Sequence, residues 1–326
     1  MLDGSGVPPA LSPIMNDTVD YGQYRAARRD GERGPLYRAA RAAWHAQQRF
    51  VYDVLLYPYG QLRHRALQAS ARRSQSHTYT SFHRVPAQLA AFTGPVLDFL
   101  LAGRDRTAPL VINLFAGSNG AEAYTLASVL SCARPGLAFH IHASDLHAEM
   151  VAKARAGRYT RDEVLHSESI TPEFIAATFD ADGQDFIVKP ALRALVSFVQ
   201  ADLLDAGLDR QYGPADVVIV QNVLFHLDPQ QARFAFGNVA RFLGPRAALL
   251  VDGVDLDLKV ELTRAAGLTP LAWRYREIYD YGRRHVALAW WRHYYGAEPR
   301  SFLKSDPVRR YGSIFLRGPA AASDPA

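Results

Sequence analysis

A run of small residues between two apolar stretches is the first place in the sequence where chemistry can be expected. Residues 113–122 read NLFAGSNGAE, with glycines at 117 and 120 between a β-rich run and a helical pattern. Glycine lets a ligand approach the backbone closely, and the first amides of a helix can face that ligand. The run is neither the GxGxxG of a dinucleotide site nor the GxxxxGK[ST] of a nucleoside triphosphate site. Hydride transfer and phosphoryl transfer are therefore disfavoured.

Two acidic residues follow later apolar runs. Asp145 ends the run AFHIHASD, and Asp202 ends the run SFVQAD. A carboxylate at the carboxyl end of a parallel strand can accept hydrogen bonds from both hydroxyls of a ribose, as we expect of Asp145. Asp202 is placed to accept from the exocyclic amine of an adenine. The alternative is that both acids cap the elements that follow them. A glycine turn with two such acids predicts a nucleoside ligand without a pyrophosphate.

A parallel sheet is needed to bring these residues together. From residue 109 onward, short apolar runs alternate with helical patterns, which is typical of parallel strands joined by crossover helices. The predicted strands are 110–115, 139–144, 196–201, 216–221 and 247–251, and the predicted helices are 121–133, 148–156, 229–243 and 258–266. Two late runs, of which 313–316 is the last, could close the sheet with an antiparallel edge. The first four strand ends should line one crevice.

The composition is that of a globular protein in a reducing compartment. The 326 residues are 48% hydrophobic and 21% charged, which excludes a disordered chain. Cys132, the one cysteine, has no disulfide partner, and we expect it to be buried as small apolar filler. No secretory signal and no run of roughly 18 apolar residues is evident. We therefore expect a cytoplasmic protein with no membrane partner.

The formal net charge of +5 raises the question of a nucleic-acid partner. Arginines between residues 25 and 73 are interleaved with aromatic residues, as on a single-strand binding face. The same residues follow helical spacing, so a solvated amphipathic region is preferred. A non-catalytic nucleic-acid-binding or scaffold protein is kept as the alternative from another class, although such a protein needs no convergent acids. We expect no nucleic-acid partner.

Several segments in a fixed order resemble the class I S-adenosylmethionine-dependent methyltransferases, and among them the CheR-type chemotaxis-receptor methyltransferases. They are AGSNGAEAYT at 116–125, ASD at 143–145, KARAGRY at 153–159, DLLD at 202–205 and QNVLF at 221–225. Upstream, TYTSFHR at 78–84 resembles the segment before the family's core. The resemblance implies an α/β fold: a Rossmann-like seven-stranded methyltransferase sheet with helices on both faces, preceded here by a helical N-terminal region.

The resemblance also implies S-adenosyl-L-methionine as cofactor and S-adenosyl-L-homocysteine as product. Glu122 would meet the methionine amino group, Asp145 the ribose and Asp202 the adenine, while Thr80 and Arg84 would hold the carboxylate. The expected cofactor-binding residues are Thr80, Arg84, Ala116, Gly117, Ser118, Glu122, Asp145, Leu146, Asp202, Leu203, Gln221 and Asn222.

The sequence indicates the methyl acceptor less clearly than it indicates the cofactor. Gln221 replaces an arginine usual in the CheR-type family and His226 replaces a tyrosine, so a small-molecule oxygen or nitrogen acceptor is favoured. A CheR-like protein glutamate carboxyl O-methyltransferase is the alternative. An alcohol, phenol or protonated amine needs a base, whereas a carboxylate does not. We expect His226 and Asn222 to be the catalytic residues; the alternative for His226 is a structural role.

Aromatic residues and arginines crowd the region after the fifth predicted strand. The expected substrate-binding residues in that region are Tyr279, Tyr281, Arg284 and Trp290, and the alternative is a core or subunit contact, so a homodimer is left open. His140 and His142 share a strand face but lack a third ligand, so we expect no metal. The predicted organisation is a flexible arm (1–19), a helical cap (20–76), a methyltransferase domain (77–317) with an insertion (157–195) and an aromatic-rich substrate region (267–312), and a tail (318–326).

Overall fold

The fold is seen in a computed structural model, which describes residues 80–105, 108–167, 169–284, 301 and 304–318 and isolated positions between 36 and 62. The predicted arm, most of the predicted helical cap and most of the tail lie outside the described residues. The part of the chain that is described contains no helix long and apolar enough to cross a bilayer.

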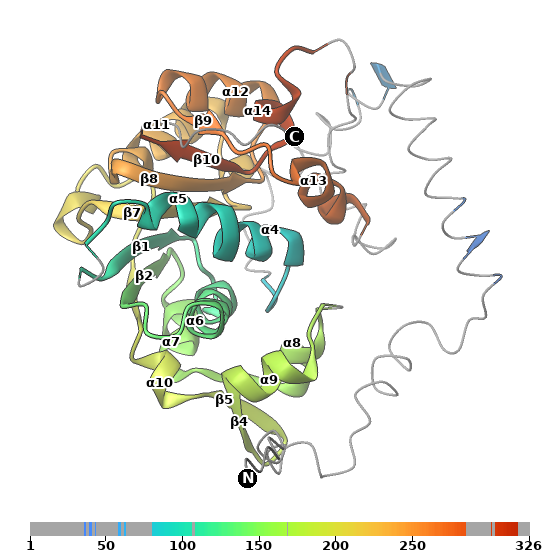
Figure 1. Cartoon of the computed structure of the whole chain (residues 1–326), viewed down its shortest axis with the longest axis vertical. Coiled ribbons are helices and arrows are strands. Elements are labelled where there is room, and N and C mark those ends of the chain that lie inside the picture. Colours follow the sequence, from blue (N-terminus) through green and yellow to red (C-terminus); the bar gives the residue numbers. More distant parts are fainter. Residues whose placement is uncertain are drawn as a thin grey trace, which may run out of the picture.

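A seven-stranded sheet forms the centre of the molecule (Figure 1). Its strands, in spatial order, are β6 (Val196–Gln200), β2 (Phe139–Asp145), β1 (Leu110–Phe115), β7 (Ala215–Gln221), β8 (Leu243–Asp252), β10 (Ile314–Arg317) and β9 (Thr269–Pro270). The first five are parallel, and β10 pairs antiparallel with both β8 and β9. The predicted α/β class and the antiparallel closure of the sheet are confirmed.

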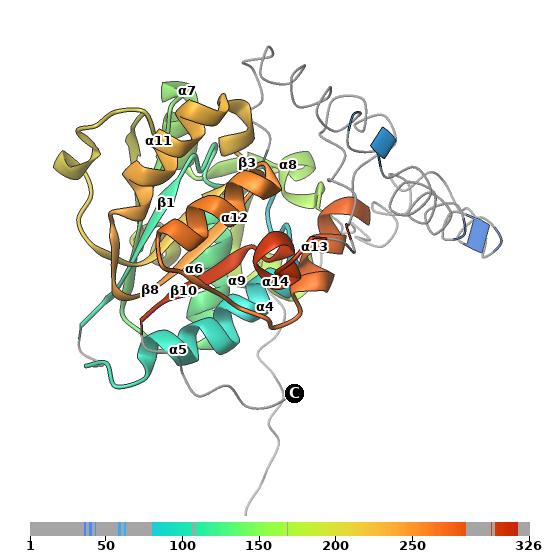
Figure 2. The same cartoon turned by 90° about the horizontal axis from the view of Figure 1, so that it is seen from above.

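Helices cover both faces of this sheet, as Figure 2 shows for α5 and α12. One face carries α4 (Pro86–Ala91), η3 (Phe92–Val96), α5 (Leu97–Leu101), α6 (Ala121–Ala133) and α7 (Ala148–Ala156). The other carries α11 (Pro229–Ala240) and α12 (Leu256–Ala265), and the short turns η4 (Leu208–Arg210) and η5 (Leu224–His226) adjoin it. Later in the chain come α13 (Tyr275–Arg284) and α14 (Pro307–Tyr311).

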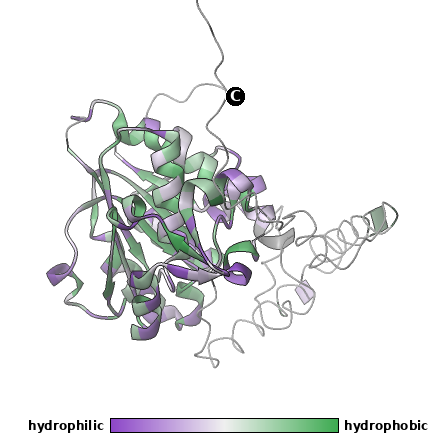
Figure 3. Cartoon of the chain, turned by 90° about the horizontal axis from the view of Figure 1, so that it is seen from below, coloured by the Kyte–Doolittle hydropathy of each residue, from purple (hydrophilic) through white to green (hydrophobic). Residues whose placement is uncertain are grey.

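The alternation of side chains along the strands divides the interior into two cores. In β7, Val217 and Ile219 belong to the core beneath α6, whereas Val218 and Val220 belong to the core beneath α11. Successive side chains point to opposite faces of a strand, so an apolar run without alternation must be buried on both sides. Much of the central sheet is accordingly coloured as hydrophobic in Figure 3.

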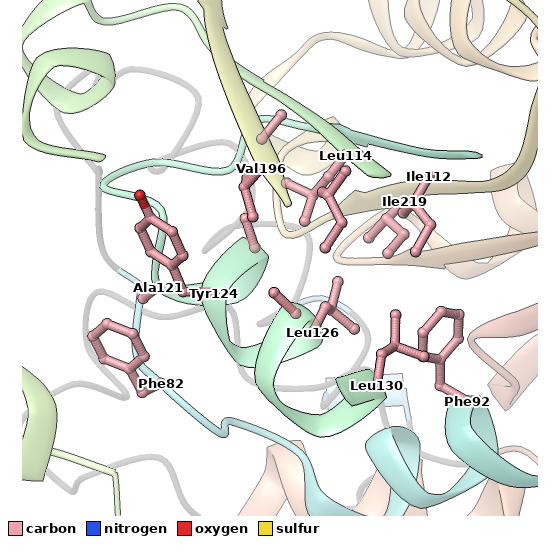
Figure 4. Packing of buried hydrophobic residues seen from close by; sticks show 14 of the residues in the cluster. Phe82, Phe92, Ile112, Leu114, Ala121, Tyr124, Leu126, Leu130, Val196 and Ile219 are labelled. Atoms are coloured by element: carbon pink, nitrogen blue, oxygen red, sulfur yellow. The ribbon is translucent and has the colours of Figure 1, made fainter. Parts of the chain in front are cut away.

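The core beneath α6 joins the helix to the sheet and to the segment before β1. Leu126 and Leu130 point from α6 toward Ile112 of β1 and Phe92 of η3 (Figure 4). None of these side chains is more than 2% exposed. Burying a large aliphatic or aromatic side chain is worth about 1.5–3 kcal/mol. This packing fixes α6, whose first turn carries Glu122.

The predicted insertion forms a small unit of its own, seen below α6 in Figure 1. It contains β3 (Arg158–Thr160), α8 (Arg161–Leu165), α9 (Pro172–Thr178), β4 (Phe179–Asp182), β5 (Asp185–Val188) and α10 (Pro190–Arg193). Its three strands make an antiparallel sheet in the order β3-β5-β4. Phe179 and Phe186 from this sheet are buried in the same core as α6.

Some predicted boundaries were wrong. The helix predicted over 229–243 ends at Ala240, because Leu243 already pairs with Ala215 at the start of the longer strand β8. The helix predicted from 258 begins at Leu256, with the Asp255 side chain accepting from the Leu258 amide. Cys132 is exposed and not the buried filler that the sequence suggested.

We expect Gly120→Ala to destabilise the protein more than Gly136→Ala. Both glycines have left-handed backbones, with φ of 89° and 84°, so either alanine costs about 1–2 kcal/mol. At Gly120 a Cβ would also lie 2.9 Å from the Ala154 Cβ and 3.1 Å from Phe198 and Tyr159 atoms, while Gly136 has open space. Overpacking adds about 1–3 kcal/mol, measurable by urea unfolding. Equal losses in the two variants would show that the packing around Gly120 relaxes.

Candidate active site

The turn after β1 has a strained backbone that ties two strand ends together. Ala116 and Ser118 have φ values of 56° and 50°, a left-handed region that non-glycine residues seldom adopt. The Ser118 amide donates to Asp145 Oδ2 at 2.7 Å, and the Gly117 amide donates to the Ser144 carbonyl at 2.7 Å. Such strain persists only where several surrounding contacts hold the backbone in place, and it is concentrated at functional sites.

Asp145 is held by the backbone on both of its carboxylate oxygens. The side chain accepts from Ser118 at Oδ2 and from the His147 amide at Oδ1, the latter at 3.0 Å, and the residue is only 7% exposed. A carboxylate has about four lone-pair directions, so each oxygen keeps a further acceptor position. Leu146, which follows, is 53% exposed. The end of β2 therefore combines a fixed carboxylate with an exposed apolar side chain.

Asp202 lies just beyond β6, the strand next to β2. Its side chain is exposed, and Oδ1 accepts from the Leu204 amide at 2.8 Å. This is the capping contact that the sequence offered as the alternative, although it closes a turn and no helix follows directly. Leu203 is buried, and its carbonyl accepts from the Asn238 side chain.

The end of β7 turns sharply against the end of β8. Asn222 has a φ of 54°, and its amide donates to the Asp252 carbonyl at 3.0 Å. A Cβ at Gly253 would lie 2.5 Å from the Asn222 Cα, so only glycine allows this approach. Immediately before the turn, Gln221 Nε2 donates to Glu122 Oε1 at 3.1 Å. The β7 turn is thereby connected to the first turn of α6.

One pocket brings together five of the predicted cofactor residues. It is partly open to solvent and is lined by Thr80, Arg84, Glu122, Gln221 and Asn222. Its other lining residues are Ser81, His83, Val85, Gln88, Leu89, Phe92, Thr125, Leu126 and Leu250. The other seven predicted cofactor residues do not line it, but lie at the ends of β1, β2 and β6: Ala116, Gly117, Ser118, Asp145, Leu146, Asp202 and Leu203.

Glu122 is the acid among the residues named above as lining this pocket, and its pKa is shifted. Burial disfavours its charged form and raises the pKa of its carboxyl to about 7, while the nearby Arg84 guanidinium acts in the opposite direction. A carboxyl that titrates near neutral pH inside a pocket is a candidate ligand-binding group. A cationic ligand group beside it would favour the charged form, so the pocket suits the amino group that the sequence predicted.

The segment before α4 is oriented by one buried aromatic ring. Phe82 is 1% exposed and makes edge contacts with Tyr159 at 4.8 Å and with Phe179 at 5.1 Å between ring centres. With Phe82 in the core, its neighbours at 80, 83 and 84 line the pocket. The His83 amide donates to Thr125 Oγ1 of α6 at 3.0 Å, which fixes the segment to the helix that carries Glu122.

Of the other predicted residues that the structure describes, His226, Tyr279 and Tyr281 do not line this pocket. His226 lies in η5 with its ring 4.1 Å from that of Phe225. Tyr279 packs on Tyr311 at 4.9 Å between ring centres, and Tyr281 lies on the same helix, α13. The side chain of Arg284 and all of Trp290 lie outside the described part of the chain.

The pair His140 and His142 engages a serine hydroxyl. His140 Nε2 and His142 Nδ1 lie 3.1 Å and 3.0 Å from Ser197 Oγ on the edge strand β6. Within the described ranges, no group of three or more histidine, cysteine, aspartate or glutamate side chains could hold a metal ion.

His83 is the pocket residue that the sequence analysis missed as a functional candidate. It stands inside the quoted segment TYTSFHR, but no spacing rule distinguishes it there from its neighbours. Its place in the pocket follows from the burial of Phe82 and from contacts with residues 125 and 169, which are distant in the chain.

The seven-stranded sheet with helices on both faces is the fold that the sequence predicts for a class I S-adenosylmethionine-dependent methyltransferase. Residues 78–260, more than half of the chain, match the family described as CheR methyltransferase, SAM binding domain. The chain belongs to this family. The predicted resemblance, the enzyme class and the cofactor are confirmed at the level of the family.

A curated relative and two solved structures show similarity to this chain. An uncharacterized 104.1 kDa protein of Rhodobacter capsulatus, encoded in the hypE 3' region, is 28% identical over 197 residues, which cover 59% of this chain and 20% of that protein. The chain thus spans about a fifth of that relative.

Among solved structures, an O-methyltransferase family protein from Burkholderia thailandensis is 18% identical, with a TM-score of 0.33 and coverage of 57% of this chain and 55% of that one. The N-methyltransferase NodS from Bradyrhizobium japonicum, in complex with S-adenosyl-L-homocysteine, is 15% identical, with a TM-score of 0.32 and coverage of 58% and 79%. Similarity at this level carries no information about the acceptor.

We expect Glu122→Gln to reduce the pH dependence of stability. The folded chain binds the carboxyl proton more tightly than the unfolded chain does, so this contribution is full below pH 4.5 and is lost as the pH rises to about 7. The wild type should lose about 3 kcal/mol of unfolding free energy from this group by about pH 8, and the variant should not. Urea denaturation across this range measures the difference. Glu149→Gln, at the same position in the first turn of α7 but exposed, is the control; if both variants behave alike, the pKa of Glu122 is not raised.

Proposed function

We propose that this protein transfers a methyl group from S-adenosylmethionine to an oxygen or nitrogen atom of a small-molecule acceptor. One observation carries the proposal: within the family-matched residues 78–260, a single pocket collects the predicted methionine-binding residues from the segment before α4, from α6 and from the end of β7.

Separate residues are proposed to contact the methionine, the ribose and the adenine of the cofactor. Glu122 accepts from the amino group, and Arg84 with Thr80 holds the carboxylate, for which a guanidinium fork is well suited. The spare lone pairs of Asp145 accept from the ribose hydroxyls. Asp202 accepts from the adenine amine, with Leu146 and Leu203 beside the base. The strained Ala116–Ser118 turn brings its backbone close to the nucleoside.

The protein then accelerates methyl transfer mainly by aligning the acceptor atom with the methyl carbon. When bound, S-adenosylmethionine supplies a methyl carbon activated by a positively charged sulfur. Rigid placement of acceptor and donor can lower the barrier by about 7–11 kcal/mol in well-oriented systems. Asn222, fixed by its contacts with β8, holds the end of the pocket where the methyl group is expected.

The acceptor side of the proposal rests on the apolar lining of the pocket. Besides its polar residues, the pocket is lined by apolar ones, as is usual for sites that take small organic molecules. They are Val85, Leu89, Phe92, Leu126 and Leu250. A hydroxyl or protonated amine must lose a proton, and a positioned base contributes about 10²–10⁴ in rate. His226 is the base that the sequence analysis favours.

The alternative acceptor is a glutamate carboxylate on a protein, and family membership is the observation that favours it. A carboxylate methyl ester releases methanol in mild alkali, whereas a methyl ether or an N-methyl group does not. Incubating the protein with isotopically labelled S-adenosylmethionine and cell extract, followed by alkali treatment of the protein and small-molecule fractions, separates the two acceptors. Alkali-labile label confined to protein would contradict the small-molecule proposal.

We expect Asp145→Ala to weaken the binding of S-adenosylhomocysteine by about 10²-fold or more. Two hydrogen bonds to a charged acceptor are lost, each worth about 1.5–3 kcal/mol. Isothermal titration calorimetry measures the affinity, and Asp145→Asn, which retains one acceptor oxygen, should be affected less. Asp205→Ala is the matched control, because Asp205 also accepts from the amide two residues ahead but lies outside the predicted site. Unchanged affinity in Asp145→Ala would exclude the proposed ribose contact.

The affinity for S-adenosylhomocysteine should also rise with pH. Its amino group is proposed to bind the ionised form of Glu122, whose pKa in the free protein is raised to about 7. Between about pH 6 and 8 the ionised fraction, and with it the affinity, should increase about tenfold. Calorimetry in buffers of different ionisation enthalpy should detect proton release on binding below pH 7. A slope that persists in Glu122→Gln would assign the titration to another group.

A further inference from the structure

His83 lies in the same pocket as the residues proposed to hold the methionine end of the cofactor. It shares the lining with Glu122, Gln221 and Asn222, whereas His226 does not contribute to it. Of the histidines that the structure describes, His83 is thus the one that lines this pocket.

The backbone of His83 is held from two sides in an unfavourable conformation. Its φ is 49°, in the left-handed region. Its amide donates to Thr125 Oγ1 of α6 at 3.0 Å, and its carbonyl accepts from the hydroxyls of Ser167, at 3.4 Å, and Ser169. Non-glycine residues keep such a conformation only where several contacts enforce it. The small inserted unit therefore helps to fix a pocket residue.

The imidazole ring of His83 packs against an aromatic ring, and one of its nitrogens makes no hydrogen bond to a described residue. It lies 5.1 Å from the Phe174 ring of α9, and Nδ1 is shielded from water with no hydrogen-bond partner among the described residues. Burial lowers the pKa of the imidazole, so the ring is neutral near pH 7. A neutral imidazole offers one acceptor nitrogen. Because Nδ1 is shielded, Nε2 is the nitrogen that can accept a proton from a ligand in the pocket.

We propose that His83, and not His226, is the base that faces the methyl acceptor. This inference rests on the proposed function. As the acceptor atom bonds to the methyl carbon, the carbon–sulfur bond breaks and its electron pair stays on sulfur, leaving a neutral thioether. The proton of the acceptor passes to the imidazole, and from there to water.

Sinefungin tests this assignment without knowledge of the acceptor, because it carries an amine where S-adenosylmethionine carries its reactive methyl group. S-adenosylhomocysteine has nothing at that position. Both are titrated calorimetrically into the wild type, His83→Phe, His83→Gln and the matched control His226→Asn. His83→Phe should weaken sinefungin binding about tenfold or more relative to S-adenosylhomocysteine, through loss of an acceptor for a charged donor. His226→Asn should change both affinities alike.

The outcomes separate this inference from the proposed function. If the wild type does not bind S-adenosylhomocysteine, the proposed function fails. If it binds, but His83→Phe affects both ligands equally or the selective loss appears in His226→Asn, the role of His83 is overturned. Should the His83 variants not fold, ¹⁵N NMR of the wild-type imidazoles decides: one histidine with a lowered pKa should shift with sinefungin and not with S-adenosylhomocysteine, and no such shift would also overturn the proposal.

Discussion

The hydrogen bond between the Ser118 amide and the Asp145 carboxylate is the contact on which the site depends most. It joins the end of β1 to the end of β2 inside the protein, where a carboxylate without partners would be costly. The same bond holds Ser118 in a left-handed backbone, so the conformation of the turn and the orientation of the acid determine each other. With the second oxygen fixed by the His147 amide, Asp145 has its remaining lone pairs in set directions before any ligand arrives.

A second constraint acts from outside the sheet. Phe82 is packed among aromatic rings that come from the inserted unit, and its burial leaves residues 80, 83 and 84 to line the pocket. Ser169 and Phe174 of the same unit contact His83. The inserted segment is thus more than a connection between β2 and β6. It fixes the segment before α4 against α6, and so determines the side of the pocket that is not built from strand ends.

Local pattern was sufficient for two helices that have a glycine at one end. The helix Ala121–Ala133 begins after Gly120, and Ala148–Ala156 ends at Gly157, whose φ of 62° suits a helix terminus, and both were predicted with their observed bounds. The strands of the inserted unit were not predicted. They are three or four residues long, too short for a clear alternation of apolar and polar residues. β4 and β5 form a hairpin around residues 183–184, whereas β3 reaches β5 from further back in the chain, with Arg158 paired to Asp182.

The pocket shows why the residues of a site are easier to predict from sequence than the interactions among them. Glu122, Gln221 and Arg84 could each be named from a motif, but their proximity, and the burial that raises the pKa of Glu122, depend on tertiary packing. The Arg84 guanidinium offsets only part of the cost of burying a charged Glu122 carboxylate. A ligand with an amino group and a carboxylate would place a cation beside Glu122 and an anion beside Arg84, so this pair favours a zwitterionic amino acid moiety over a neutral one of the same size.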